Sequence, residues 1–125
     1  MTRRVLVVDD EPDIREIVRM ALEMLAGWTI LTASSGAEAL RIAASEQPDA
    51  VLLDVMMPGM DGPETARRLA ENAETADIPV MLLPAKAMTA ERAQLAAAPV
   101  VGVLTKPFDP MELAGDIREL LGWSS

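Results

Sequence analysis

The chain has 125 residues, half of them apolar, and its 20 acidic and 11 basic residues give a net charge of −9. Cysteine, histidine and tyrosine are absent, which excludes disulfides, thiol or imidazole metal sites, and catalysis by a histidine base. The acidic balance argues against direct nucleic-acid binding, because phosphate contacts need a basic surface, and no apolar run is long enough to cross a membrane.

The chain opens with a strand, a helix, a strand and a second helix. The run VLVV at 5–8 predicts a buried strand, because it is β-branched and does not alternate with polar residues. The next segment has one apolar helix face, between Pro12, which suits a first helical turn, and Gly27, which suits a helix end. A second strand is expected at 28–33, followed by an alanine-rich helix at 36–46.

The same alternation continues to the end of the chain. A third buried strand is expected at 49–54, and after a Gly-rich loop Pro63 begins a helix. A fourth strand at 78–83 is followed by a short helix at 89–98 and a fifth strand at 100–105. A final amphipathic helix then completes five strands and five helices.

Two helix starts have cap signatures. Ser35 and Glu38 form a capping box before the second helix. Asp109 as N-cap, Pro110 at the first helical position and Glu112 two residues later predict the start of the last helix. These signatures fix where the two helices are expected to begin.

Strands that alternate with helices indicate a parallel sheet with helices on both faces. Linkers, repeats and low-complexity segments are not evident in the sequence, so we expect one domain over residues 1–125, with no output domain visible. Ligands of such sheets bind beyond the carboxyl ends of the strands. The residues at those ends are therefore the candidates for function.

Charged residues gather at the expected strand ends. Asp9 and Asp10 follow the first strand, with Glu11 beside them, while Asp54 ends the third strand and Lys106 follows the fifth. Carboxylates this close raise one another's pKa, and a hard cation such as Mg²⁺ would neutralise them. An aspartate beside Mg²⁺ and a lysine can act as a nucleophile toward a phosphoryl group.

Three motifs occur in the order and spacing of one known family: VVDDE, LLDVMMPGMDG and LTKPF. Essentially the whole chain resembles the receiver domain of bacterial two-component response regulators. The resemblance implies a flavodoxin-like (CheY-like) sheet of strand order 2-1-3-4-5. It also implies Mg²⁺-dependent phosphotransfer from a sensor histidine kinase or a histidine phosphotransfer protein. The domain would be a cytoplasmic phosphoprotein that signals through a protein partner, and no enzyme beyond its own phosphorylation and dephosphorylation.

The resemblance also implies a role for each candidate residue. Asp54 matches the phosphoacceptor, and Asp9 and Asp10 match the acidic pair that holds Mg²⁺. Met56 matches the position whose backbone carbonyl completes the metal site. Lys106 matches the lysine that contacts the phosphoryl group, and its bond to the following proline matches a typically cis peptide bond that would aim the lysine inward.

Three positions depart from the family pattern. Pro84 stands where the fourth strand usually ends in Thr or Ser, so a side-chain hydroxyl is missing, although the amide of Ala85 could still donate to a phosphoryl oxygen. Val103 replaces the usual Tyr or Phe, and Pro99 stands where Gly is frequent. In the family the hydroxyl and the ring report phosphorylation together, which predicts an atypical switch here. Packing alone could also account for apolar replacements of this size.

Other functions can be weighed on the same residues. A haloacid-dehalogenase-like phosphatase also uses a strand-end aspartate with Mg²⁺, but it needs a second aspartate where Met56 stands. A dinucleotide oxidoreductase needs a Gly-rich turn where the sequence has DDEPD. A phosphorylation-independent pseudo-receiver agrees with Pro84 and Val103 but not with the intact acids and lysine, and Mg²⁺ binding would distinguish it from a working receiver.

Overall fold

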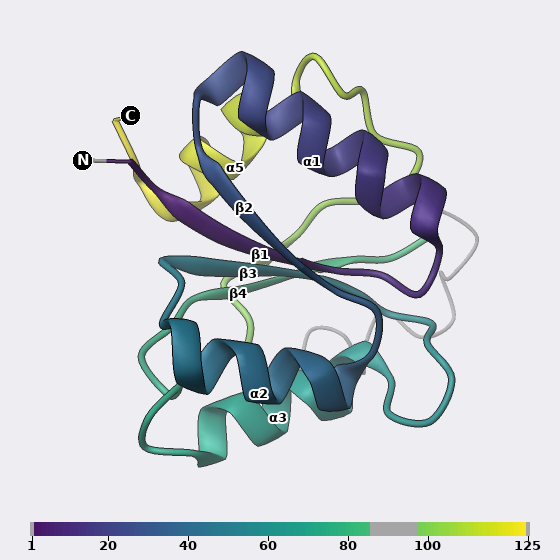
Figure 1. Cartoon of the computed structure of the whole chain (residues 1–125), viewed down its shortest axis with the longest axis vertical. Helices are drawn as coiled ribbons and strands as arrows, with labels where there is room; N and C mark the ends of the chain where they lie inside the picture. The colour runs from purple at the N-terminus through teal and green to yellow at the C-terminus, as the bar shows by residue number, and fades with distance from the viewer. Residues whose placement is uncertain (1, 86–97, 125) are drawn as a thin grey trace.

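The computed structural model describes residues 2–85 and 98–124. Its strands form one parallel sheet in the order β2-β1-β3-β4-β5, which is the order expected from the sequence. The strands are β1 (Arg4–Val8), β2 (Thr29–Ala33), β3 (Ala50–Asp54), β4 (Val80–Leu83) and β5 (Gly102–Val103). The sheet runs through the middle of the molecule, between two layers of helices (Figure 1).

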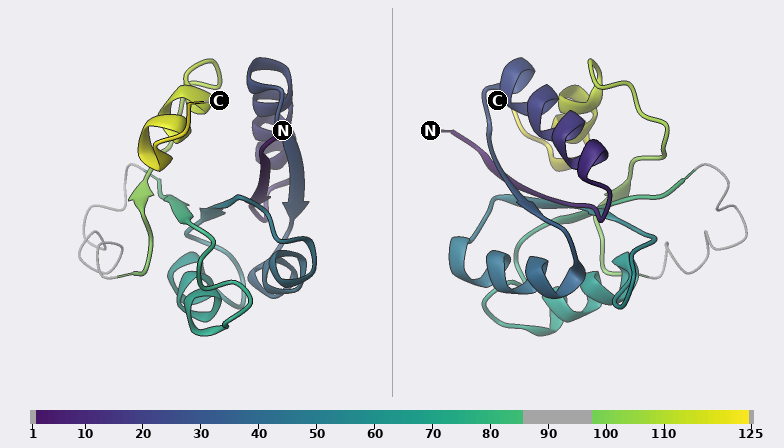
Figure 2. Two further views of the ribbon diagram at one scale, coloured as in Figure 1. Left: turned by 90° about the vertical axis from the view of Figure 1, so that its left-hand side faces the viewer. Right: turned by 45° about the vertical axis from the view of Figure 1, so that its right-hand side comes forward.

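The described helices are α1 (Pro12–Ala26), α2 (Gly36–Glu46), α3 (Gly62–Glu71) and α5 (Leu113–Leu121). Helices α1 and α5 cover one face of the sheet, and α2 and α3 cover the other (Figures 1 and 2). The helix expected at 89–98 lies outside the described residues, apart from Ala98. None of the described helices has the length and apolarity that a membrane crossing requires.

Successive strand residues point into two separate apolar layers. The layer under α2 and α3 includes the buried residues Leu6, Val8, Val51, Leu53, Val80, Leu82, Ala39, Ala43, Ala66 and Leu69. The layer under α1 and α5 includes Val5, Val7, Leu52, Met81, Leu83, Val18, Leu22, Leu113 and Ile117. Burial on both faces explains why β1, β3 and β4 are almost entirely apolar, whereas β2 at the sheet edge carries exposed threonines. Among the described residues, the buried charged side chains are Asp9 and Asp54, both at carboxyl ends of strands.

Side-chain caps fix the starts of α2 and α3, near the carboxyl edge of the sheet. Ser35 accepts the Glu38 N–H at 3.1 Å, as the capping box predicts, while the Glu38 carboxylate accepts the N–H of Ser34 at 2.6 Å. Helix α1 ends at Ala26, and the glycine that follows as its C-cap, Gly27, has a φ of 72°. Asp61 caps α3 in the same way as Ser35 caps α2, although the sequence reading placed it in a plain loop.

The expected extent of the fifth strand is wrong. The run 100–105 contributes only the short strand β5, although the backbone continues beside β4, with the Leu104 N–H donating to the Leu82 carbonyl at 2.8 Å. A parallel ladder would next require the nitrogen of residue 84 to donate to the Leu104 carbonyl. Pro84 has no N–H, so the regular ladder stops there.

The expected start of the last helix is also wrong. Helix α5 begins at Leu113 rather than at Pro110. The Asp109 carboxylate accepts the Met111 N–H at 2.9 Å, and the Asp109 carbonyl accepts the Glu112 N–H at 2.9 Å. Asp109 therefore caps a tight turn that precedes the helix, because Asp satisfies backbone groups in turns as readily as at helix starts.

Candidate functional site

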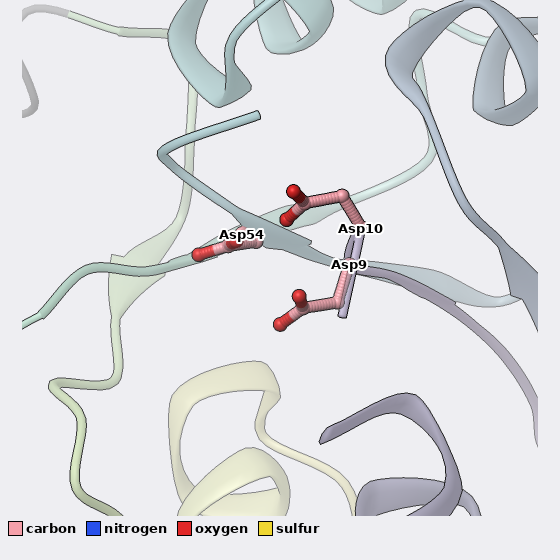
Figure 3. A group of neighbouring side chains, drawn as sticks. All are labelled: Asp9, Asp10 and Asp54. Atoms are coloured by element: carbon pink, nitrogen blue, oxygen red, sulfur yellow. The ribbon is translucent and has the colours of Figure 1, made fainter. Parts of the chain in front are cut away.

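An acidic cluster lies where β1 and β3 end side by side. These strands pair in parallel with Val8 opposite Leu53, so Asp9 and Asp54 occupy neighbouring places at the sheet edge. The side chains of Asp9, Asp10 and Asp54 face a common space (Figure 3). One carboxylate oxygen of each lies within 4.8 Å of the others. The structure thus brings together the three acids that the sequence reading placed at strand ends.

Lys106 reaches this cluster from the chain after β5. Its Nζ lies 3.2 Å from Asp9 Oδ2 and 3.2 Å from Asp54 Oδ1. The lysine side chain is 19% exposed, and those of the two aspartates are 2% and 7% exposed. A parallel bridge between Ala85 and Lys106 fixes the backbone here, and the Lys106–Pro107 peptide bond is cis, as the family resemblance implies.

Backbone amides hold the two buried carboxylates in place. The Glu11 N–H donates to Asp9 Oδ1 at 2.9 Å, and the Val55 N–H donates to Asp54 Oδ1 at 2.9 Å. Arg15 from the first turns of α1 donates through Nη1 to the Asp9 carbonyl oxygen at 2.7 Å. The sequence reading missed Arg15, because an arginine on an amphipathic helix gives no signal that it turns back to a strand end.

The charges in the cluster do not balance. Burial raises the pKa of the Asp54 carboxyl above its usual value, and the negative charge of Asp9 raises it further, while Lys106 lowers it in part. For Lys106, burial alone would lower the pKa, but the charges of Asp54 and Asp9 outweigh burial and raise it. Among the residues that the structure describes, three carboxylates face one ammonium group, so the cluster carries excess negative charge that a further cation would neutralise.

The donor set fits a hard divalent cation. Every side-chain donor in the cluster is a carboxylate oxygen, which suits Mg²⁺ and not a soft metal. Met56 lies two residues after Asp54 and is 68% exposed. Its thioether is a soft ligand that does not suit Mg²⁺, so any contribution from this residue rests on its backbone carbonyl. Asp9, Asp10 and Asp54 are therefore the side chains that could hold the cation.

Two of the three positions that depart from the family pattern, Pro84 and Val103, lie at the ends of β4 and β5. Pro84 is buried directly after β4, and its carbonyl accepts the Lys106 N–H at 2.7 Å. Ala85, next in the chain, is exposed. Val103 is partly buried and packs against the apolar layer under α2 and α3. Neither Pro84 nor Val103 offers a side-chain hydrogen bond to the site.

An apolar groove leads away from the cluster between α1 and the turn before α5. Its first cavity, of about 400 Å³, is lined by Ile14, Ile17, Ala85, Lys106, Pro107, Phe108 and Pro110. Its second cavity, of about 300 Å³, is lined by Ile17, Met20, Ala21, Met24, Leu25, Pro110 and Met111. We call these residues the α1 groove. The sequence reading missed it, because the groove depends on how the turn packs beside α1.

The fold and the acidic site define a receiver-type domain, and the family comparison agrees. Residues 5–118 match the family model of the response regulator receiver domain, and the chain belongs to this family. It is 40% identical over 119 residues to the phosphate regulon transcriptional regulatory protein PhoB of Pseudomonas aeruginosa, covering 95% of this chain and 52% of that protein. It is 41% identical over 121 residues to the response regulator MprA of Mycobacterium ulcerans, covering 97% and 51%. The chain spans about half the length of these relatives.

Solved structures share the fold over nearly the whole chain. The chemotaxis response regulator CheY4 of Vibrio cholerae matches with a TM-score of 0.87 at 30% identity, covering 96% of this chain and 99% of that one. The receiver domain of the sensor histidine kinase PA1611 of Pseudomonas aeruginosa matches with a TM-score of 0.87 at 26% identity, covering 98% and 99%. The latter structure has a magnesium ion coordinated in its active site cleft. The flavodoxin-like, CheY-like fold expected from the sequence is confirmed.

Proposed function

We propose that this domain accepts a phosphoryl group on Asp54 in a Mg²⁺-dependent reaction. The observation that carries the proposal is the convergence of Asp9, Asp10 and Asp54 on one space, with Lys106 bonded to two of them. Asp9, Asp10, Asp54 and the Met56 carbonyl would hold the cation. A magnesium ion in the active site cleft of the related PA1611 receiver supports this choice of metal.

The phosphodonor is proposed to be a histidine kinase or a histidine phosphotransfer protein. A carboxylate oxygen of Asp54 attacks the phosphorus, and the phosphorus–nitrogen bond of the phosphohistidine breaks, leaving its electron pair on the imidazole. Lys106 and the Ala85 amide stabilise negative charge on the phosphoryl oxygens. Mg²⁺, when bound, neutralises the crowded carboxylates and polarises the phosphoryl group. Water later cleaves the acyl phosphate, so the domain modifies itself and is no enzyme toward other substrates.

The experiment that tests this function is intact mass after incubation with acetyl phosphate, with and without Mg²⁺. We expect the wild-type domain to gain one phosphoryl group with Mg²⁺ and none without it, because the unneutralised cluster repels an anionic donor. No gain under either condition, together with no Mg²⁺ binding, would favour the phosphorylation-independent pseudo-receiver.

We propose that the switch of this receiver is atypical. Pro84 lacks both a hydroxyl and an N–H, and Val103 packs inward without an aromatic ring to move. The site therefore keeps the acceptor, the metal ligands and the lysine, but residue 84 itself supplies no hydrogen-bond donor to the phosphoryl group. The downstream partner would read a surface change different from that of a receiver with the usual hydroxyl and ring.

The Pro84→Thr variant is expected to accept phosphoryl groups about tenfold faster than the wild type, because a hydroxyl donor to the transferring group is restored. Rates are measured by quenched intact mass with acetyl phosphate and Mg²⁺. The matched control is Pro84→Ala, which restores the backbone N–H without the hydroxyl. Equal rates for the threonine and alanine variants would show that the hydroxyl plays no part.

We propose that the α1 groove receives the helix that carries the donor histidine. The groove starts at Lys106, which touches the phosphoacceptor, and continues along α1, so a partner helix that reaches Asp54 from this side would cover it. Ile17, Met20 and Met24 follow one helix face and are 46%, 47% and 77% exposed. An apolar stripe at this spacing beside a groove suits an amphipathic partner helix.

The Met24→Glu variant is expected to receive phosphoryl groups at least tenfold more slowly from a histidine kinase that phosphorylates the wild type. A tenfold loss corresponds to about 1.4 kcal/mol, which is the level expected for an anchor residue of an interface. Its rate with acetyl phosphate should stay at the wild-type value, because Met24 does not touch the acidic cluster. The control is Ala37→Glu, on the exposed face of α2. Equal losses in both variants, or a loss with acetyl phosphate, would contradict docking at this groove.

The acidic composition also bears on partners. With a net charge of −9, we propose that this domain itself does not contact nucleic acid. A relative from Synechocystis, RpaA, is 38% identical over 118 residues and is named as a DNA-binding transcriptional regulator, but this chain spans 48% of its length. The partner proposed for this domain is a protein surface.

A further inference from the structure

The start of α3 lies directly against the backbone of the proposed phosphoacceptor. Gly62, the first residue of α3, donates its N–H to the Val55 carbonyl at 2.9 Å. A Cβ atom on Gly62 would lie 2.4 Å from the Asp54 carbonyl oxygen and 2.9 Å from Val55 Cα. Both obstacles are backbone atoms, which cannot rotate away as a side chain can.

Space, and not backbone conformation, is what requires glycine here. Gly27, Gly59 and Gly122 have positive φ values of 72°, 80° and 69°, which side chains rarely adopt. Gly62 is not among the positive-φ glycines of the described chain, and the first position of a helix accepts most residues. The missing Cβ is therefore the property that this position uses.

The peptide unit under Gly62 also orients the phosphoacceptor. The Asp54 carbonyl and the Val55 N–H belong to one planar group, so moving one moves the other. That N–H donates to Asp54 Oδ1 at 2.9 Å, and the same oxygen lies 3.2 Å from Lys106 Nζ. A Cβ on Gly62 would have to push this peptide, since Cβ atoms essentially never approach other atoms within 3.0 Å.

We propose that Gly62 is a positioning residue for phosphotransfer: its missing Cβ lets α3 close on the Asp54–Val55 peptide, which holds the Asp54 carboxylate toward Lys106 and the metal ligands. The inference rests on the proposed function, since positioning matters where Asp54 is the acceptor. Displacing a reacting group by a fraction of an ångström to one ångström slows such reactions by up to about 100-fold.

The test compares Gly62→Ala with Gly36→Ala. A Cβ on Gly36 would meet Thr65 Oγ1 at the same 2.4 Å, and its next nearest atoms are Met60 Cβ at 3.1 Å and the Met60 carbonyl oxygen at 3.2 Å, not atoms of the Asp54 peptide. Both substitutions are made in a Gly115→Ala background, which adds stability to offset the loss expected from each. Gly115 is exposed on α5 with open space around it, and alanine stabilises a helix at such a position. The readouts are the unfolding midpoint, the rate of phosphorylation by acetyl phosphate with Mg²⁺, and the Val55 amide resonance.

We expect both variants to unfold at lower temperature, but Gly62→Ala alone to be phosphorylated about 10- to 100-fold more slowly and to shift the Val55 resonance. Wild-type rates in Gly62→Ala, or equal slowing in both variants, would overturn the proposal. Failure of Gly62→Ala to fold where Gly36→Ala folds would also overturn it, because the glycine would then serve folding and not positioning.

A failure of the proposed function gives a different result. In that case the background protein itself gains no phosphoryl group, whatever residue stands at position 62. The Val55 resonance and the affinity for Mg²⁺ then test the positioning of Asp54 without phosphotransfer. If Gly62→Ala leaves both at the values of the background protein, the positioning role is contradicted on its own.

Discussion

The Asp54→Asn variant is expected to gain no phosphoryl group under conditions in which the wild-type domain gains one. Asparagine keeps the size of the side chain and an oxygen that can accept the Val55 N–H, which lies 2.9 Å from Asp54 Oδ1. Its amide, however, is a far weaker nucleophile than a carboxylate. Intact mass after incubation with acetyl phosphate and Mg²⁺ measures the difference directly.

A matched control for this variant is Asp61→Asn. Asp61 lies in the loop that follows β3, and its carboxylate accepts the Glu64 N–H at 2.9 Å as the cap of α3. Asparagine caps a helix as well as aspartate does, so the variant removes one acidic group from the same loop and leaves the helix start intact. It should gain a phosphoryl group as the wild type does. A phosphoryl gain in Asp54→Asn would contradict the assignment and move the acceptor to another acid of the cluster.

The same Asp54→Asn variant should be more stable than the wild type when Mg²⁺ is absent. Burial, and then the charge of Asp9, raise the pKa of the Asp54 carboxyl. A carboxyl group whose pKa is higher in the folded state than in the unfolded state makes the folded protein less stable as pH rises. The loss begins at the unfolded pKa, about 3.9, and is complete above the folded pKa. The advantage of the variant in thermal unfolding should therefore vanish near pH 4 and be complete above the folded pKa of Asp54. A constant difference at all pH values would attribute the effect to packing.

The position of the acidic site could be predicted because its residues are tied to strand ends. Asp9 and Asp54 directly follow apolar runs, with Asp10 next to Asp9, and parallel strands bring their carboxyl ends to one edge of the sheet. A shift of a strand boundary by one or two residues would not move these side chains to another edge. The prediction therefore depends on the strand order alone, which the structure confirms.

Other features depend on contacts that no local pattern records. The early end of β5 follows from Pro84 lying opposite it, which requires the register of β4 against β5 as well as the identity of residue 84. The role of Arg15 depends on the angle of α1 over β1, and the α1 groove depends on the turn at Asp109. Each of these features is a tertiary arrangement between separate segments of the chain. At Asp109 the local sequence also cannot distinguish a turn from a helix start, because aspartate satisfies backbone N–H groups in both.

The Lys106→Met variant is expected to be destabilised by about 3 kcal/mol at pH 7 without Mg²⁺. Lys106 Nζ lies 3.2 Å from both Asp9 and Asp54, and the two carboxylates are nearly inaccessible to water. Methionine keeps much of the length and apolar surface of the lysine stem but leaves two buried negative charges without a cation. Removing one partner of a buried ion pair has a cost at about this level. Chemical unfolding curves give the change in the free energy of unfolding.

The dependence of this loss on pH distinguishes charge from packing. In the variant, the lowering effect of Lys106 on the pKa of Asp54 is gone, so this pKa rises further. A raised carboxyl pKa means that stability returns as pH falls through it, so the deficit should shrink toward pH 4. In the wild type, the raised pKa of Lys106 means that its contribution is complete below about pH 10.4 and is lost as pH rises through its folded pKa.

A second substitution tests whether the two unpaired carboxylates, and not the packing of residue 106, cause the loss of stability. In the Lys106→Met background, Asp54→Asn removes one of the two unpaired charges and should recover part of the lost stability, so the two changes are not additive. Mg²⁺ should recover more of it, because a cation in the cluster replaces the ammonium charge and binds the folded state alone. If the deficit is the same at pH 4 and pH 7, and neither Asp54→Asn nor Mg²⁺ reduces it, the lysine acts through packing and the cluster does not need its charge.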